Sequence, residues 1–399
     1  MNLLDNVIQP YAWGSRTALA ELMGRPTPSP TPEAELWMGA HPGAPSRVRG
    51  GGASTSLLEL IRQAPERELG EAITRRFGAD LPFLLKVLAA GAPLSLQTHP
   101  SLPQAREGFA RENAQGVPLS APHRNYKDAN HKPELICALT PFDALCGFRR
   151  ADETLELFNA LAVPALEQLL SPLRESTDTL GVRRMFEALM TMPREEARTL
   201  VGMAVASCSQ LASRSAPYAE EMRWAVRLAQ LYPGDPGVLG ALMLNLVRLA
   251  PGEAIYLPAG NLHAYLEGVG VEIMANSDNV LRGGCTPKHV DVPELLRVLD
   301  FRCGPIPPMR AQASQGGEEV YATPTEEFRL SRIPLASGAT VRPARRGAEI
   351  LLCIEGRARI SSGSDLLELP RGASAFVSAS DGAYGLEGEG VVFRATAGL

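Results

Sequence analysis

The chain has 399 residues, of which 45% are hydrophobic and 21% charged, and its formal net charge is −5 at pH 7. This length exceeds one ordinary hydrophobic core, so we expect a folded protein of two or three domains. The mild acidity and a pI near 5.8 argue against nucleic acid or an anionic membrane as partner. Local Arg and Lys side chains must therefore hold any anionic substrate.

Neither a leader peptide nor a membrane span is predicted. The start MNLLDNVIQPYAWGS has no basic segment followed by an apolar one, and no window approaches about 18 uninterrupted apolar residues. We therefore expect a cytoplasmic protein. Six cysteines without CxxC spacing favour reduced, mostly buried thiols over a disulfide scaffold: Cys137, Cys146, Cys208, Cys285, Cys303 and Cys353.

Residues 1–150 are rich in Gly and Pro and contain short apolar runs such as LPFLLKVL at 81–88. This pattern is typical of short strands in a sandwich. We expect few helices here, one of them over residues 56–63.

Helical periodicity replaces this pattern between about residues 151 and 232. Apolar side chains recur at helical spacing at Leu155, Phe158, Leu161, Met185 and Leu189, and plausible helix starts are Asp152, Asp178 and Pro193. The segment therefore predicts a small all-helical insertion.

Strand signals return after the breaker PGDPG at 233–237, over residues 242–249 and 254–257. A further helix is expected over residues 292–298, and short strands and turns dominate residues 301–399. We therefore predict a β domain made of residues 1–150 plus 235–300, a helical insertion at 151–234, and a C-terminal β domain at 301–399.

The C-terminal region contains a segment that resembles an earlier segment of the chain, and we call the two the echo segments. GEAIYLPAGNLHAYLEGVGV at 252–271 aligns without gaps on GASAFVSASDGAYGLEGEGV at 372–391, which indicates two copies of one β unit. Ala383 stands where the first copy has His263, and no QxH or KPE string accompanies it, so we expect no metal there. A chance match between two Gly-rich hairpins is the alternative.

Candidate metal ligands come from three separate stretches. Gln97 and His99 are two positions apart, as are Lys132 and Glu134, and such pairs share one face of a strand. Together with His263 they offer two imidazoles, one carboxylate and one amide oxygen. This set suits Zn²⁺, with Fe, Mn or Co also possible. The residues alone leave open that both histidines are structural.

Charged residues are dense near these candidates. Glu272 follows His263, and NSDNVLRGGCTPKH at 276–289 carries Asp278, Arg282 and Lys288. Charge in loops is most often simply solvated. Cations beside a metal and two carboxylates would also suit phosphate binding and acid–base chemistry.

Six strings, in order along nearly 290 residues, resemble type I mannose-6-phosphate isomerases: YAWGS at 11–15, AELWMGAHP at 34–42, PFLLKVLAAGAPLSLQTHP at 82–100, HKPE at 131–134, LPAGNLHAYLEG at 257–268 and NSDNVLRGGCTPKH at 276–289. The resemblance implies a mainly β fold, with a cupin-type jelly-roll catalytic sandwich, a helical insertion and a second, metal-free cupin-like domain. It also implies one zinc per chain and interconversion of mannose 6-phosphate and fructose 6-phosphate through a cis-enediol.

By motif, the resemblance implies roles for twelve residues. The zinc ligands would be Gln97, His99, Glu134 and His263; the catalytic residues Arg282, Lys132 and Asp278; and the sugar-phosphate residues Lys86, Ser95, Tyr265, Glu272 and Lys288. The proton carrier stays open among Lys132, Asp278, Glu272 and a water on the metal. We expect a monomer whose partner is a small sugar phosphate.

Two other functions remain to be tested. Cupin-like sites also support iron dioxygenases, although an amide ligand, only two histidines and a basic pocket favour redox-inert zinc. A sugar-phosphate sensor would bind tightly without turnover, and would leave the Lys and Arg side chains near the metal without a role.

Overall fold

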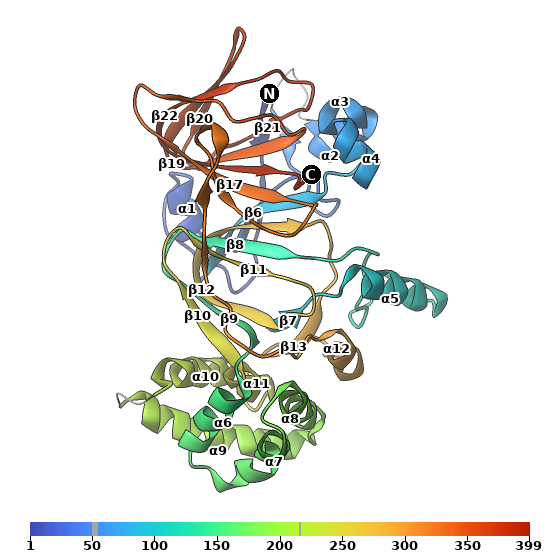
Figure 1. Ribbon diagram of the computed structural model, residues 1–399, viewed down its shortest axis with the longest axis vertical. Helices are drawn as coiled ribbons and strands as arrows, with labels where there is room; N and C mark the ends of the chain where they lie inside the picture. The colour runs from blue at the N-terminus through green and yellow to red at the C-terminus, as the bar shows by residue number, and fades with distance from the viewer. Residues whose placement is uncertain (50–54, 215–216) are drawn as a thin grey trace.

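The computed structural model describes residues 1–49, 55–214 and 217–399. The elements form three tiers along the longest axis, with the C-terminal strands at the top, a central sheet in the middle and a block of helices at the bottom (Figure 1). Two 11-stranded sheets account for the upper tiers, and the pairs between their strands are antiparallel. No helix in these ranges is long and apolar enough to cross a membrane.

The central sheet follows the order β14-β11-β8-β12-β6-β3-β2, and β7, β9, β10 and β13 join it off this path. Its strands are β2 (Val7–Gln9), β3 (Glu35–Met38), β6 (Phe83–Ala90), β7 (Leu96–Thr98), β8 (Glu134–Ala138), β9 (Phe142–Phe148), β10 (Leu244–Leu249), β11 (Glu253–Leu257), β12 (His263–Ala275), β13 (Leu281–Gly284) and β14 (Met309–Arg310). Strand β12 is central to this sheet, since it pairs with β7 and β9 at its start and with β6 and β8 further along.

The C-terminal sheet follows the order β15-β16-β17-β22-β19-β21-β1-β4-β5, with β18 on β22 and β20 on β19. Its strands are β1 (Asn2–Asp5), β4 (Arg47–Val48), β5 (Thr55–Ser56), β15 (Gln312–Ala313), β16 (Glu319–Tyr321), β17 (Arg329–Leu335), β18 (Thr340–Val341), β19 (Glu349–Ser362), β20 (Asp365–Pro370), β21 (Ser374–Val377) and β22 (Gly385–Thr396). Because β1 pairs with β21, the N-terminus is part of this sheet, which the sequence patterns did not indicate.

The two echo segments have the same strand arrangement. In the first, β11 and β12 lie on either side of β8, and in the second, β21 and β22 lie on either side of β19. Each segment is thus a strand, a loop and a second strand joined through a shared neighbour. This arrangement favours a true repeat over a chance match.

The expectation of few helices before residue 150 is wrong. The described part of this region has α1 (Ala18–Leu22), α2 (Leu57–Gln63), α3 (Pro65–Leu69), α4 (Glu71–Phe77) and α5 (Leu102–Ala114). Only α2 was predicted. The longest, α5, buries just Ala105, Gly108 and Glu112, so it lacks apolar periodicity. Its capping box, formed by Ser101 and Gln104, was the signal that could have revealed it.

The predicted helical insertion is confirmed as α6 (Ala151–Ala160), η1 (Pro164–Leu166), α7 (Glu167–Glu175), α8 (Thr179–Thr191), α9 (Arg194–Ala212) and α10 (Ala219–Leu231). A further helix that was not predicted, α11 (Gly237–Leu242), begins at the end of the breaker. Asp178 caps α8, since its carboxylate accepts the N–H groups of Leu180 and Gly181. The predicted helix at 292–298 is α12 (Val292–Val298), and η2 (Gln315–Gly317) is a short turn. The strand expected from residue 242 begins at Leu244, because α11 runs through Leu242.

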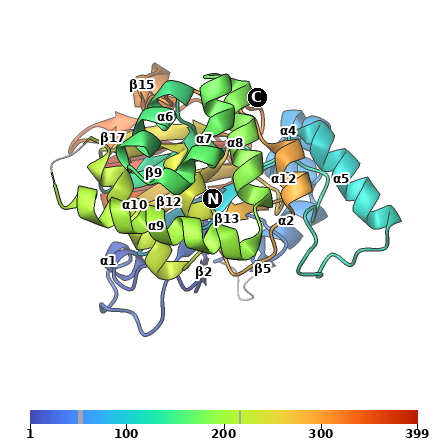
Figure 2. The ribbon, with the colours of Figure 1, turned by 90° about the horizontal axis from the view of Figure 1, so that it is seen from below.

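Shared cores hold the tiers together. Phe186 and Val238 of the helical block pack in one cluster with Leu96, Leu262 and Leu281 from the central strands. The helices therefore cover one end of the central sheet, as the view from below shows (Figure 2). A second cluster joins side chains from β6 and β12 to side chains from β19 and β22, so the two sheets also pack on each other. All six cysteines are free and five are buried, as predicted.

Candidate metal centre and substrate pocket

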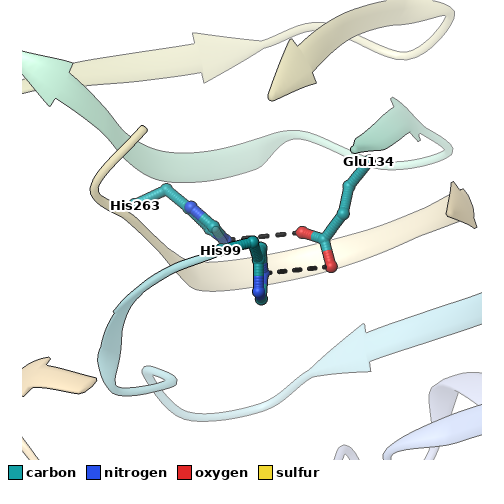
Figure 3. Close-up of side chains that lie close together, drawn as sticks. All are labelled: His99, Glu134 and His263. Carbon is teal, nitrogen blue, oxygen red and sulfur yellow. Dashed lines mark ion pairs between the residues drawn. The ribbon is translucent and has the colours of Figure 1, made fainter. Parts of the chain in front are cut away.

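Three of the predicted ligands converge in the central sheet. The Nε2 atoms of His99 and His263 lie 3.4 Å from Oε1 and Oε2 of Glu134, respectively. All three side chains are buried, and their ligand atoms lie within 4.8 Å of one another. Figure 3 shows both imidazoles pointing toward the one carboxylate. The geometry is that of a candidate metal site.

The pairing of the strands explains this convergence. His263 at the start of β12 lies opposite Gln97 of β7, and Glu134 at the start of β8 lies opposite Met274 of β12. His99 follows β7 by one residue. Because each of these strands neighbours β12, side chains distant in sequence face one space.

Backbone carbonyls fix how the two imidazoles are protonated. Nδ1 of His99 lies 2.7 Å from the carbonyl oxygen of Asn279, and Nδ1 of His263 lies 3.0 Å from that of Asn261. A carbonyl oxygen can only accept, so each Nδ1 carries the proton and donates it. The Nε2 lone pairs therefore face Glu134, as metal-binding histidines require.

The buried polar atoms of this cluster fit a cation. Among the described residues, Nε2 of His99 and Oε2 of Glu134 have no hydrogen-bond partner. Burial, with the nearby charge of Lys132, lowers the pKa of His99 to about 4. Burial alone would raise the pKa of Glu134, but Lys132 and the imidazoles lower it well below its usual value. The unprotonated imidazole nitrogens thus face the ionised carboxylate with no hydrogen between them. A bound cation would accept electron pairs from all of these atoms.

Gln97 completes the set. Its side-chain amide lies 3.5 Å from Nε2 of His263, measured to Nε2 of the amide. A half-turn of the amide exchanges its nitrogen and oxygen, which presents a carbonyl oxygen at the same place. Gln97 is therefore positioned to offer a fourth, oxygen ligand.

A network of buried charges lies beside the cluster. Lys132 Nζ is 2.9 Å from Oε1 of Glu134. Lys86 Nζ is 3.0 Å from Glu272 and 3.6 Å from Glu35. Burial would lower the pKa of Lys86, but Glu272 and Glu35 outweigh burial and raise it. Lys86 is therefore a charged ammonium matched by two carboxylates.

Tyr265 and Glu272 lie on the same strand, β12. The Tyr265 hydroxyl is buried and, within the described ranges, has no hydrogen-bond partner. Burial, and then the charges of Glu272 and Glu134, raise the pKa of Tyr265 well above its usual value. Burial also raises the pKa of Glu272. A neutral phenol with an unused donor is thus available in the site.

Two cations near the ligands are unpaired. Arg282 of β13 lies opposite Gln97 in the sheet. Within the described ranges, neither its guanidinium nor the Lys288 ammonium forms an ion pair or hydrogen bond with another residue. Burial lowers the pKa of Arg282, and burial together with Arg282 lowers that of Lys288. Ser95 directly precedes β7. These groups are free to meet an anionic ligand.

Asp278 has an exposed side chain, unlike the buried residues of this cluster. It lines a cavity of about 600 Å³ that also contacts His41, Lys127 and Asp128. Nε2 of His41 lies 3.3 Å from Oδ1 of its carboxylate. Hydrogen bonding to His41 lowers the pKa of Asp278.

Several contacts of the site were not predicted from sequence. His41, Glu35 and Trp37 lie in the string AELWMGAHP, and Asn279 lies in NSDNVLRGGCTPKH. Trp37 Nε1 donates to Glu35 at 2.7 Å, and Asn279 supports His99. Each string contains these polar and aromatic residues, but the spacing within a string does not predict which distant residue each side chain contacts.

The fold and the site together define a class of protein: an enzyme built on antiparallel sheets, with a candidate metal centre beside a charged pocket. Comparison with known families narrows the class. A model of the type I phosphomannose isomerase catalytic domain matches residues 1–151, and a model of the mannose-6-phosphate isomerase cupin domain matches residues 318–397.

Full-length relatives agree with these matches. The chain is 43% identical to mannose-6-phosphate isomerase of Escherichia coli K12 over 399 residues, and 41% identical to that of Salmonella typhimurium LT2 over 397 residues. Both alignments cover 99% of each chain. The bovine enzyme is 33% identical over 406 residues, which cover 95% of this chain and 93% of the relative.

Solved structures superpose over the same length. A zinc-bound mannose 6-phosphate isomerase matches with a TM-score of 0.91 and 39% identity, covering 100% of this chain and 99% of the other. A glutamate-to-alanine mutant of the Salmonella typhimurium enzyme gives 0.91 and 39%, covering 100% of both. The chain belongs to the type I mannose-6-phosphate isomerase family, and the resemblance found in its sequence is confirmed.

Proposed function

We propose that the chain interconverts mannose 6-phosphate and fructose 6-phosphate with one zinc per chain, held by Gln97, His99, Glu134 and His263. The observation that carries this proposal is the set of buried acceptor atoms facing one another without a proton between them. Two imidazoles and one carboxylate favour zinc. The zinc-bound relative, 39% identical, supports the same metal.

The proposed reaction moves a proton between carbon 2 and carbon 1 through a cis-enediol. When bound, zinc would act as a Lewis acid toward the sugar oxygens. Lys132 and Asp278 are the proposed proton carriers. Lys132 is held 2.9 Å from Glu134. The contact with His41 lowers the pKa of Asp278, and its ionised carboxylate can accept a proton.

Charge that develops on the sugar oxygens needs a fixed positive partner. We assign this role to Arg282, because its guanidinium is half-buried, unpaired within the described ranges and opposite Gln97. A donor that is already oriented stabilises developing charge without reorganising.

The remaining residues are assigned to substrate binding. Lys288 and Ser95 are proposed to bind the phosphate, because Lys288 is an unpaired cation next to Arg282 among the described residues. Lys86 is already neutralised by Glu272 and Glu35. We therefore propose that Lys86, Tyr265 and Glu272 line the sugar end of the pocket.

We further propose the division into residues 1–150 plus 235–300, 151–234 and 301–399, with no metal in the last part. The repeat supports this, since Ala383 takes the place of His263. We also propose a monomer, because each ligand of the candidate site comes from the same chain.

Chelator-treated and zinc-restored protein, incubated with mannose 6-phosphate in deuterated water, tests the proposal. We expect fructose 6-phosphate, with deuterium on its carbon skeleton, only from the zinc-restored sample. Oxygen consumption would instead indicate a dioxygenase. Tight binding of the sugar phosphate by the zinc-restored protein without interconversion would instead indicate a sensor.

A further inference from the structure

His41 is a buried histidine outside the proposed set of catalytic and binding residues. It lies in the loop after β3 and is 6% exposed. Its Nδ1 accepts the backbone N–H of Gly43 at 3.1 Å. Because a backbone N–H can only donate, the neutral ring must carry its proton on Nε2.

That Nε2–H faces the proposed proton carrier. Nε2 of His41 lies 3.3 Å from Oδ1 of Asp278. The Trp37 ring meets the imidazole edge-on, with ring centroids 4.9 Å apart and an interplanar angle of 75°. Gly43 and Trp37 thus hold the imidazole so that its one donor points at the carboxylate.

Asp278 is held by its backbone but not by its side chain. Its N–H donates to Oδ2 of Asp128 at 2.8 Å, and the Ser277 hydroxyl donates to Oδ1 of Asp128 at 2.9 Å. In the described part of the chain, the carboxylate of Asp278 has a polar contact only with His41. Its direction therefore depends on that histidine.

We propose that His41 is a positioning residue that holds the Asp278 carboxylate in the direction needed for proton transfer. The inference rests on the proposed function, because it requires Asp278 to carry a proton. It assigns to a buried loop histidine the orienting task that a third group performs for the base in many enzymes.

Other titratable groups also face Asp278 from the elements packed around it: Tyr11, Lys86, Lys127, Asp128 and Lys132. Lys132 and Lys86 lower the pKa of Asp278, but less than the hydrogen bond to His41 does. Loss of His41 should therefore raise the pKa of Asp278. The acidic limb of the kcat profile should then move to higher pH.

Two substitutions distinguish the role of Nδ1 of His41 from the role of Nε2. The amide of His41→Asn can accept the Gly43 N–H but is too short to reach Asp278. The longer amide of His41→Gln can place a donor near the former Nε2. We expect His41→Asn to lower kcat about tenfold with little change in KM, and to move the acidic limb to higher pH. His41→Gln should restore most of both.

The role through Asp278 is tested by adding His41→Asn to Asp278→Asn. The double variant should be no slower than Asp278→Asn alone, because both changes remove one function. Additive losses, an unmoved acidic limb, or equal defects in the Asn and Gln variants at matched melting temperature and zinc content would overturn the proposal. Absence of turnover in the unaltered zinc-loaded protein would overturn the proposed function itself, and this inference with it.

Discussion

At the scale of single residues, Glu134 has the most demanding environment in the site. Its carboxylate is 2% exposed, and its oxygens lie close to both imidazoles and to Lys132. A buried carboxylate is costly unless positive charge compensates it. Lys132 supplies one positive charge, and the proposed zinc would supply more. This balance explains why Glu134 remains ionised in the absence of solvent.

Arg282→Ala tests whether the unpaired guanidinium acts on the reaction. We predict that turnover falls by roughly two orders of magnitude, the usual loss when one preorganised donor is removed. Steady-state kinetics on zinc-loaded variant protein measures the effect. Turnover near that of the unaltered protein, with the metal bound, would rule out this role.

Asn279→Ala tests the support behind His99. The Asn279 amide binds the backbone of Asp128 and Asn130, and its Oδ1 accepts the N–H of Lys127, which together hold the carbonyl that orients His99. We predict zinc affinity about tenfold lower, as is typical for loss of an outer support of a ligand. Competition with a coloured chelator measures the affinity. Unchanged affinity would show that the loop holds its shape without the amide.

The convergence of His99, Glu134 and His263 could be anticipated from sequence, because positions two apart on a strand share a face. Two such fragments and one further histidine offered metal-binding side chains. The supports could not be anticipated. His99 and Asn279 are 180 positions apart, and His41 meets Asp278 only through folding. Such contacts depend on how strands pair, which single-sequence patterns do not specify.

At the scale of elements, helices α5 and α9 differ in how tightly their glycines are packed. Helix α5 projects from the central sheet (Figure 1), and its Gly108 faces the fully buried Tyr126. A Cβ on Gly108 would lie 2.3 Å from the Tyr126 ring. Gly202 of α9 has open space around it, with nothing within 4 Å of a new Cβ. The two positions form a matched pair.

We predict that Gly108→Ala destabilises the protein by about 1–3 kcal/mol, because a buried ring must move. Gly202→Ala should stabilise it by roughly 0.4–1 kcal/mol, because alanine favours the helix and restricts the unfolded chain. Urea unfolding measures both free energies. Similar effects at the two glycines would contradict the packing described here.

Helices could be predicted from sequence where apolar residues recur strongly at helical spacing. Helix α12 and the long helices of the insertion were predicted, since their apolar positions recur on one face. Helix α5 was not, because only three of its residues are buried. Strand β1 was not placed in the C-terminal sheet, since its partner β21 lies over 370 positions away.

At the scale of the whole molecule, the segment that leads into β17 of the C-terminal sheet forms an ion pair with the site region. His131, in the HKPE string, lies 2.7 Å from Glu327. Both residues line the cavity that contains Asp278. The upper tier therefore braces the segment that leads into β8 and Glu134.

This brace predicts a dependence of stability on pH. Burial would raise the pKa of Glu327, but hydrogen bonds from His131 and Thr325 lower it to about 2, from 4.5. A lowered folded pKa contributes stability above the unfolded value, and that contribution is lost as the pH falls toward 2. Between about pH 5 and pH 3, Glu327→Gln should lose less unfolding free energy than the unaltered protein. If the unfolding free energies of Glu327→Gln and the unaltered protein, measured with urea, fall equally with pH, the prediction is contradicted.

Four side chains from three stretches of one chain are proposed to hold one zinc. Anomalous diffraction at the zinc edge, on crystals of zinc-restored protein, tests this directly. We predict one zinc peak per chain, about 2.0–2.2 Å from Nε2 of His99 and His263 and from oxygens of Glu134 and Gln97. A peak elsewhere in the molecule, or one without Glu134 as a ligand, would contradict the account.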